Sequence, residues 1–133
     1  MIVVDTSVLV DFLRGRKTDA AERLRRMEED LVPFAIPAIC GQEVLQGARD
    51  QREWKVLFET LDSQRILVSE HPWKTHAEAA RIFFDCRRRG LTIRGTVDCL
   101  IAQMVMEIDG VLLHDDDDFE KVRAVRPLRT LRK

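Results

Sequence analysis

The chain opens with Met1-Ile-Val-Val-Asp-Thr-Ser-Val-Leu-Val-Asp-Phe12, and this stretch decides the fold. Ile2 to Val4 are β-branched and apolar, which predicts a short strand that is covered on both faces. Asp5 interrupts the run, and the hydroxyl residues Thr6 and Ser7 are typical of a helix start, where they can accept from free backbone N–H groups. In open α/β sheets, ligands bind beyond the carboxyl ends of the strands. Asp5 is therefore the first candidate site residue.

Length and composition predict one folded domain over residues 1–133. Hydrophobic residues make up 45% of the sequence and charged residues 34%, which is typical of a globular protein rather than a disordered one. The formal net charge of -1 argues against a broad basic surface. It allows an acidic pocket with a basic rim, because 17 of the 22 basic residues are arginine, the side chain that best matches phosphate.

Cysteine usage and hydropathy predict a reduced, cytosolic chain. Cys40, Cys86 and Cys99 lie far apart and lack metal-ligand spacing. No segment reaches the roughly 18 apolar residues of a membrane span. Asp5 and Asp11 interrupt the first apolar run, so a signal peptide is not expected.

Strand and helix signals alternate along the chain. After the opening strand, strand signals fall at Phe34–Ile36, Ile66–Val68 and Val111–Leu113, and the tail 122–133 is typical of an edge strand. Helical patterns lie between them. This alternation predicts an α/β domain with a central, mainly parallel sheet of four to five short strands, flanked by helices.

Two apolar stripes are expected to pack in the core. The first has spacing i, i+3, i+4, i+7 and consists of Trp54, Leu57, Phe58 and Leu61. A dimer contact is the alternative. The second lies on the helix that begins at Pro72 and consists of Ala79, Ala80, Phe83 and Phe84. That helix ends in Arg87-Arg-Arg-Gly90, which the helix dipole favours; a phosphate contact is the alternative.

Further carboxylates fall near the expected strand ends. Glu43 lies within the apolar stripe of a helix over 37–47, and an inward carboxylate is costly unless it is paired or binds a metal. A solvent-facing Glu is the alternative. Asp98 lies in the first turn of the helix that starts at Thr96, where the dipole is expected to keep it ionised. The run Asp115–Asp118 follows a strand, as Asp5 does, although a solvated turn would also fit.

Carboxylates gathered at one sheet edge predict a metal-dependent hydrolase. They would repel one another strongly without a cation. Oxygen ligands with no His or Cys beside them suit Mg²⁺ or Mn²⁺ rather than zinc. Such a site activates water and stabilises the charge that develops on a phosphodiester during in-line displacement.

Four segments in this order together resemble a PIN domain: Asp5-Thr-Ser-Val-Leu-Val10, Glu43, Asp98-Cys-Leu-Ile-Ala102 and Val111-Leu-Leu-His-Asp-Asp-Asp-Asp-Phe119. The small size makes the chain most similar to the VapC toxins of prokaryotic toxin–antitoxin pairs. The resemblance implies a three-layer sandwich and an endoribonuclease that uses Mg²⁺ or Mn²⁺ to cut structured RNA, a tRNA or ribosomal RNA. It also implies a cytoplasmic homodimer and a VapB-type antitoxin whose C-terminal segment blocks the acidic pocket.

The family's site carries over by position. Asp5, Glu43 and Asp98 match its acidic triad, and Asp116 its fourth acid, with Asp118 as an additional ligand or supporting group. The sequence departs here from the family's pattern, in which this loop mixes Asp with Asn, Arg or Ser, and four Asp in a row leave the register open by one or two residues.

Three further residues are candidates for positioning or substrate contact. Thr6 and Ser7 match the small hydroxyl residues after the family's first Asp, and they are expected to position that loop or bind phosphate. Arg94, just before the helix that carries Asp98, is the candidate RNA contact.

Other classes fit less well. A haloacid-dehalogenase-type phosphatase needs an Asp where Ser7 stands, a receiver domain needs an Asp in Ile66–Ser69, and an EF-hand needs a central Gly and a closing Glu. Two alternatives stay open within the fold: a nuclease of RNA processing or decay, and a PIN-like module that binds RNA or a partner without cutting. A gene for a small DNA-binding antitoxin directly upstream would favour the toxin.

Overall fold

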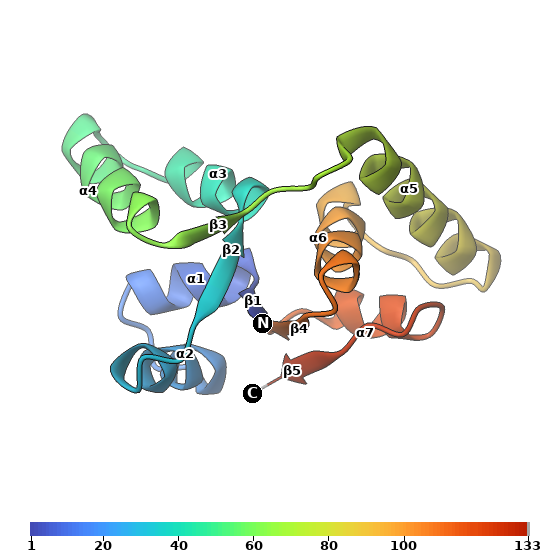
Figure 1. The fold of residues 1–133 in the computed structure, drawn as a ribbon, viewed down its shortest axis with the longest axis horizontal. Coiled ribbons are helices and arrows are strands. Elements are labelled where there is room, and N and C mark those ends of the chain that lie inside the picture. The colour runs from blue at the N-terminus through green and yellow to red at the C-terminus, as the bar shows by residue number, and fades with distance from the viewer. Residues whose placement is uncertain (133) are drawn as a thin grey trace.

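The protein is a three-layer sandwich in this computed structural model, which describes residues 1–132 (Figure 1). Within that range the strands are β1 (Ile2–Val4), β2 (Phe34–Pro37), β3 (Arg65–Leu67), β4 (Val111–His114) and β5 (Thr130–Arg132). The helices in the same range are α1 (Thr6–Leu13), α2 (Asp19–Glu29), α3 (Ala38–Gln46), α4 (Gln51–Asp62), α5 (Pro72–Arg88), α6 (Thr96–Glu107) and α7 (Asp117–Arg123).

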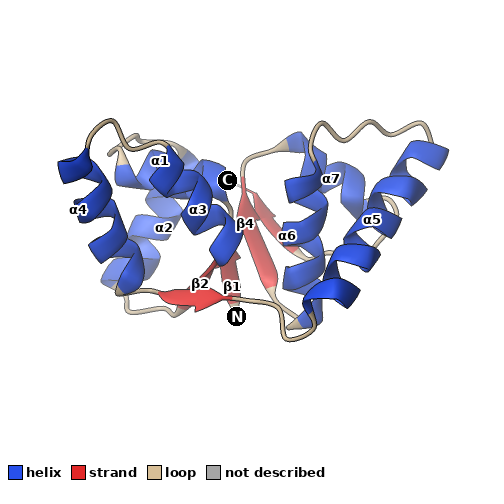
Figure 2. Cartoon of the chain, turned by 90° about the horizontal axis from the view of Figure 1, so that it is seen from above, coloured by secondary structure: helices blue, strands red, loops and turns tan. Residues whose placement is uncertain are grey.

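The sheet has the order β3-β2-β1-β4-β5, and every neighbouring pair is parallel. Helices α1 to α4 cover one face and α5 to α7 the other (Figure 2). Because β1 lies at the centre, between β2 and β4, its carboxyl end faces the middle of one edge of the sheet. The predicted α/β sandwich with a parallel sheet of short strands is confirmed.

The core lies on both faces of β1 and β4. Val3, Val4, Leu112 and Leu113 are fully buried, as expected for strands that helices cover on each side. Phe119 of α7 is the largest fully buried side chain. Burying these groups contributes roughly 1.5–3 kcal/mol for each large side chain, which anchors the ends of β1 and β4 rigidly.

The predicted packing of α4 is wrong for two of its four residues. Leu61 is buried, but Trp54 and Phe58 are 45% and 42% exposed and stack on each other with ring centroids 5.3 Å apart. The cause is the position of α4 at the end of its helix layer, where it has neighbours on one side only (Figure 2).

The predicted inner face of α5 and the predicted extent of the last strand also need correction. Ala79 is buried but Ala80 and Phe84 are exposed, because the buried face runs through Thr75, Ala79, Ile82 and Cys86. In the tail predicted over 122–133, Val122 belongs to α7, the strand covers only Thr130–Arg132, and Lys133 lies outside the described residues. β5 does lie at a sheet edge, as predicted.

No helix among residues 1–132 is long and apolar enough to cross a membrane. Cys40, Cys86 and Cys99 are free and buried. Burial raises the pKa of the Cys40 and Cys99 thiols to about 12, so these two stay protonated and unreactive at neutral pH.

Candidate metal centre

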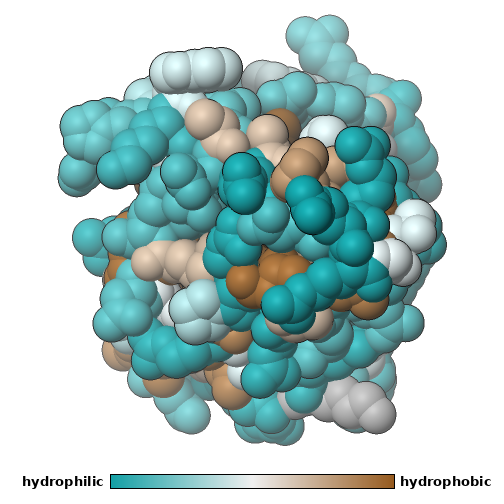
Figure 3. All heavy atoms as spheres, turned by 90° about the vertical axis from the view of Figure 1, so that its right-hand side faces the viewer, coloured by the Kyte–Doolittle hydropathy of each residue, from teal (hydrophilic) through white to brown (hydrophobic). Residues whose placement is uncertain are grey.

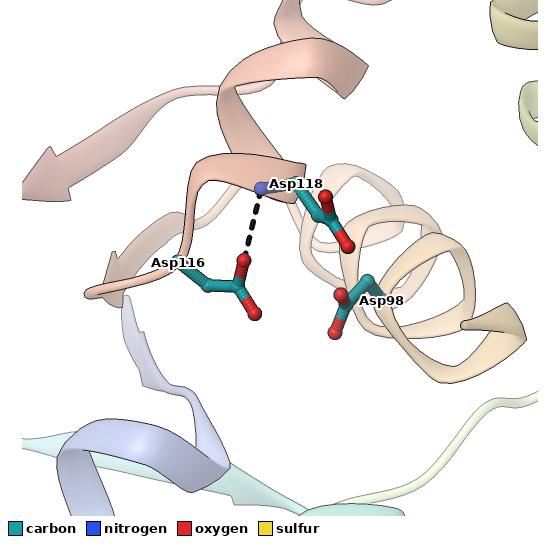
Figure 4. Close-up of side chains that lie close together, drawn as sticks. All are labelled: Asp98, Asp116 and Asp118. Carbon is teal, nitrogen blue, oxygen red and sulfur yellow. Dashed lines mark hydrogen bonds between the residues drawn. The ribbon is translucent and has the colours of Figure 1, made fainter. Parts of the chain in front are cut away.

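Three carboxylates meet beyond the carboxyl end of β4. Asp98 reaches this point from the first turn of α6, and Asp116 and Asp118 reach it from the start of α7 (Figure 4). One oxygen from each can be chosen so that all three lie within 4.8 Å of one another. Around an octahedral Mg²⁺ with bonds of about 2.1 Å, ligand oxygens lie about 3.0–4.2 Å apart. The oxygen-only donor set therefore fits a hard divalent cation after small side-chain movements.

At the start of α7, the side chains of the four consecutive aspartates point in two different directions. Asp116 is the N-cap of α7, and its Oδ1 accepts from the backbone N–H of Asp118 at 2.9 Å. Asp115 and Asp117 instead pair with Arg132 of β5, at 3.6 Å and 2.7 Å. Asp116 and Asp118, the two that the sequence assigned to the site, are thus the ones that the structure brings beside Asp98.

Donors hold Asp118 as an ionised group. Burial alone would raise its pKa, but the backbone N–H of Arg94 and the ammonium of Lys121 outweigh that effect and lower the pKa below its ordinary value. The N–H of Arg94 lies 3.1 Å from Oδ2, and Nζ of Lys121 lies 3.1 Å from Oδ1. The Arg94 guanidinium is 77% exposed and reaches Asp116 Oδ1 at 3.4 Å. The predicted RNA contact thus lies at the rim of the acidic centre.

Asp5 stands at the end of β1, buried to 4% exposure. Its backbone N–H donates to Leu113 O, which fixes it beside the end of β4. Burial raises the pKa of its carboxyl group, against donors from the hydroxyl and backbone N–H of Ser7. The predicted role of the hydroxyls as acceptors at the helix start is wrong: Asp5 is itself the N-cap, and Ser7 donates to it.

Glu43 is exposed, so of the two alternatives that the sequence left open, the inner face of the helix and a solvent-facing position, the structure shows the second. It nevertheless reaches toward the site, because its Oε1 accepts from the Thr6 hydroxyl at 2.7 Å. Thr6 therefore joins the helix after Asp5 to the helix that carries Glu43. Asp5 and Glu43 lie outside the set of three mutually close carboxylates, but the charge of each acts on Asp98.

The ionised state that the helix dipole alone predicts for Asp98 does not hold without a cation, whereas the predicted repulsion among the gathered carboxylates does. Burial, followed by the negative charges of Asp116 and Asp5, raises its pKa to about 7. The dipole of α6 does not compensate because the charges of four carboxylates act on this one group. Without a bound cation, Asp98 therefore holds a proton up to much higher pH than an ordinary aspartate does.

This shift predicts a pH-dependent effect of Asp98→Asn on stability without metal. The carboxyl group has a pKa of about 3.9 in the unfolded chain and about 7 in the folded protein. Its ionisation then opposes folding, and the free energy of unfolding falls as pH rises between these values. Asn carries no charge, so the substitution should stabilise the protein more at about pH 8 than at about pH 5. Urea unfolding in EDTA measures both, and an equal gain at the two pH values would contradict the shift.

His114, the last residue of β4, is a supporting residue that the sequence interpretation missed. It is fully buried, and its Nδ1 accepts from the backbone N–H of Asp116 at 3.1 Å. The ring proton is therefore on Nε2, which lies 2.9 Å from Glu120. The ring packs on Phe119 with centroids 4.9 Å apart. The only signal in the sequence was a polar residue that closes an apolar strand.

Replacing His114 should destabilise the protein strongly. His114→Leu leaves the N–H of Asp116 and the carboxylate of Glu120 without this partner, which costs roughly 2–4 kcal/mol in the free energy of unfolding. His71→Leu is the matched control, because His71 is exposed and should change stability by no more than about 0.5 kcal/mol. Urea unfolding compares the two, and equal midpoints would contradict the structural role of His114.

The chain belongs to the PIN domain family, whose model matches residues 2–125. It is 30% identical over 130 residues to VapC ribonuclease Mb1587 of Mycobacterium bovis and to ribonuclease VapC11 of Mycobacterium tuberculosis, covering 97% of this chain and 96% of each relative. The resemblance to this family is confirmed.

Solved structures of toxin–antitoxin complexes share the fold. VapBC-1 of nontypeable Haemophilus influenzae matches with a TM-score of 0.74 and 17% identity, over 99% of this chain and 98% of that one. VapBC2 of Rickettsia felis, solved bound to a promoter DNA fragment, matches with a TM-score of 0.73 and 16% identity. The match covers 100% of this chain and 99% of that one.

Proposed function

We propose that this chain is the endoribonuclease toxin of a type II toxin–antitoxin module and that it hydrolyses phosphodiester bonds in structured RNA, a tRNA or ribosomal RNA. The observation that carries the proposal is the convergence of Asp98, Asp116 and Asp118 beyond the end of β4, with Asp5 directly after the adjacent strand β1. Similarity to the two mycobacterial ribonucleases over nearly the whole chain supports the choice of RNA as substrate.

The acidic residues would hold Mg²⁺ or Mn²⁺. A divalent ion there supplies positive charge to the scissile phosphate and lowers the pKa of attacking water. Asp98, Asp116 and Asp118 are its proposed ligands, with Asp5 and Glu43 as further acidic ligands. The Ser7 hydroxyl orients Asp5 through a hydrogen bond of 2.6 Å. The Thr6 hydroxyl orients Glu43 through a hydrogen bond of 2.7 Å.

Charged neighbours prepare the centre for substrate. Lys121 and the backbone N–H of Arg94 hold Asp118 in one orientation. The exposed guanidinium of Arg94 places a positive charge at the rim, where it would bind a phosphate next to the one that reacts. Because Asp118 is already held in place, no free energy is spent on orienting it during the reaction.

Two partners belong to the proposal. A VapB-type antitoxin is supported by the shared fold with toxins solved in VapBC complexes. A second copy of this chain is supported by exposed apolar side chains near the sheet edge at β3, namely Trp54, Phe58, Ile66 and Val68. Such an exposed group is typical of an association surface. A cytoplasmic location follows from the proposed RNA target.

A processing or decay nuclease of the same fold is the alternative, and growth under induced expression separates the two. The wild-type chain should arrest a bacterial host, Asp5→Asn should not, and co-expression of the gene directly upstream should restore growth. Asp117→Asn is the matched control and should stay toxic, because Asp117 pairs with Arg132, away from the centre. Unimpeded growth at full expression of the wild type would contradict the toxin assignment.

A further inference from the structure

The end of α5 carries a concentration of positive charge that the acidic centre does not use. Residues 81–96 contain five arginines and one acidic residue, in a chain whose net charge is -1. Arg87, Arg88 and Arg89 form what we call the arginine strip, and all three are exposed. Figure 3 shows this side of the molecule, where hydrophilic side chains surround smaller apolar areas.

Aromatic rings support the guanidinium groups of the strip. Arg87 lies over Phe83 at 5.8 Å from the ring centroid, and Arg88 lies over Phe84 at 5.7 Å. Such contacts hold a planar guanidinium in place while its edge N–H groups stay free to bind phosphate. Phe84 itself is 39% exposed, which leaves part of an aromatic surface beside the charges.

The helix dipole does not account for the whole strip. It favours Arg87 and Arg88 in the last turn of α5, but Arg89 lies beyond the helix. Within residues 1–132, no carboxylate lies within ion-pair distance of these three side chains, while Arg89 donates to Ala124 O at 2.8 Å. The nearby Asp85 is already paired with Arg81 and Arg126. The positive charge of the strip is thus largely uncompensated.

One loop connects the arginine strip to the acidic centre along the chain. The loop from Arg89 to Gly95 joins the end of α5 to the start of α6 (Figure 2). Two contacts fix this loop against α7: the N–H of Arg94 donates to Asp118, and Lys121 Nζ donates to Thr92 O at 2.7 Å. The strip and Arg94 therefore lie at the two ends of one fixed loop, and Arg94 contacts the carboxylates.

We propose that the arginine strip binds the phosphate backbone of the RNA strand whose scissile bond lies in the acidic centre. This inference rests on the proposed ribonuclease function and names the path of its substrate. The carboxylates repel the flanking phosphates of RNA, and the strip supplies attraction for them in addition to that of Arg94 and a bound divalent ion. Sequence-independent phosphate contacts also fit side chains that offer charge and stacking rather than a pocket for one base.

The test is RNA binding by the double variant R87Q/R88Q, measured as fluorescence anisotropy of a labelled single-stranded RNA in EDTA. Affinity should fall roughly tenfold, and the slope of log K against log salt should shrink by about 1.4, because each phosphate contact to a single strand contributes about 0.7. The matched control K17Q/R26Q removes two exposed charges, one just before α2 and one on it, and α2 covers the other face of the sheet (Figure 2). Its affinity should stay within about twofold of wild type.

Each outcome decides the inference. If R87Q/R88Q binds RNA with the affinity and salt slope of the wild type, the arginine strip does not bind RNA. An equal loss of affinity in K17Q/R26Q would also contradict the proposal, because it would show a diffuse effect of net charge. If either of these results is found and the wild-type protein still cleaves RNA, the proposed ribonuclease function holds without the proposed role of the arginine strip. A wild-type chain that neither binds nor cleaves RNA overturns both. Unchanged unfolding midpoints in the two variants confirm that folding is not the cause.

Discussion

Asp116→Asn should lower the rate of RNA cleavage by roughly three orders of magnitude, because the loss of one ligand charge removes about 4 kcal/mol of transition-state stabilisation. The fold should survive, since Asn caps helices as well as Asp does and Asp116 is the N-cap of α7. Initial rates on a labelled RNA in Mn²⁺ measure the effect.

The neighbouring variant Asp117→Asn is the matched control. It changes one carboxylate to an amide one residue further along, but Asp117 points to Arg132, so cleavage should stay within about twofold of wild type. If the two variants lose activity equally, or if Asp117→Asn loses more, the division of the four aspartates between the acidic centre and β5 is wrong.

Mn²⁺ or Mg²⁺ should raise the melting temperature of the metal-free protein. A ligand at about 100 times its dissociation constant stabilises the folded state by about 2.7 kcal/mol. For a chain of 133 residues this corresponds to a shift of roughly 8–10 °C. Burial and then repulsion from the neighbouring carboxylates raise the pKa of Asp98 to about 7, and a bound cation would offset both effects, which is the physical source of the affinity.

Sodium chloride at matched ionic strength controls for simple screening of charge and should produce only a small shift. Asp98→Asn should reduce the response to Mn²⁺, because one proposed ligand is gone. A melting temperature that does not rise with millimolar divalent cation, or that rises equally in sodium chloride, would contradict the metal centre.

The architecture was predictable because it depends on simple patterns. The run Ile2 to Val4 before Asp5 predicts a covered strand with a carboxylate at its end, and Val111–Leu113 before the aspartates repeats that pattern. Parallel pairing of β1 with β4 then places both strand ends at one edge of the sheet. Asp5 and the aspartate run could therefore be assigned to one region without coordinates.

The details of the site depend on geometry that no local pattern contains. The N-cap of α7 and the ion pair with Arg132, a residue distant in sequence, determine which of Asp115–Asp118 face Asp98. The raised pKa of Asp98 sums burial and charges from three other segments. Trp54 follows a helical stripe, but periodicity does not tell whether a neighbour covers that stripe.

Cleavage of total cellular RNA by the purified protein tests the central claim most directly, with reactions in Mn²⁺, in EDTA, and with Asp98→Asn in Mn²⁺. Metal-dependent cuts at a few discrete sites, lost in EDTA and in the variant, are the expected result, and mapping the new ends identifies the RNA target. Intact RNA with every metal, from protein shown to be free of antitoxin, would contradict the claim and favour a PIN-fold module that binds without cutting.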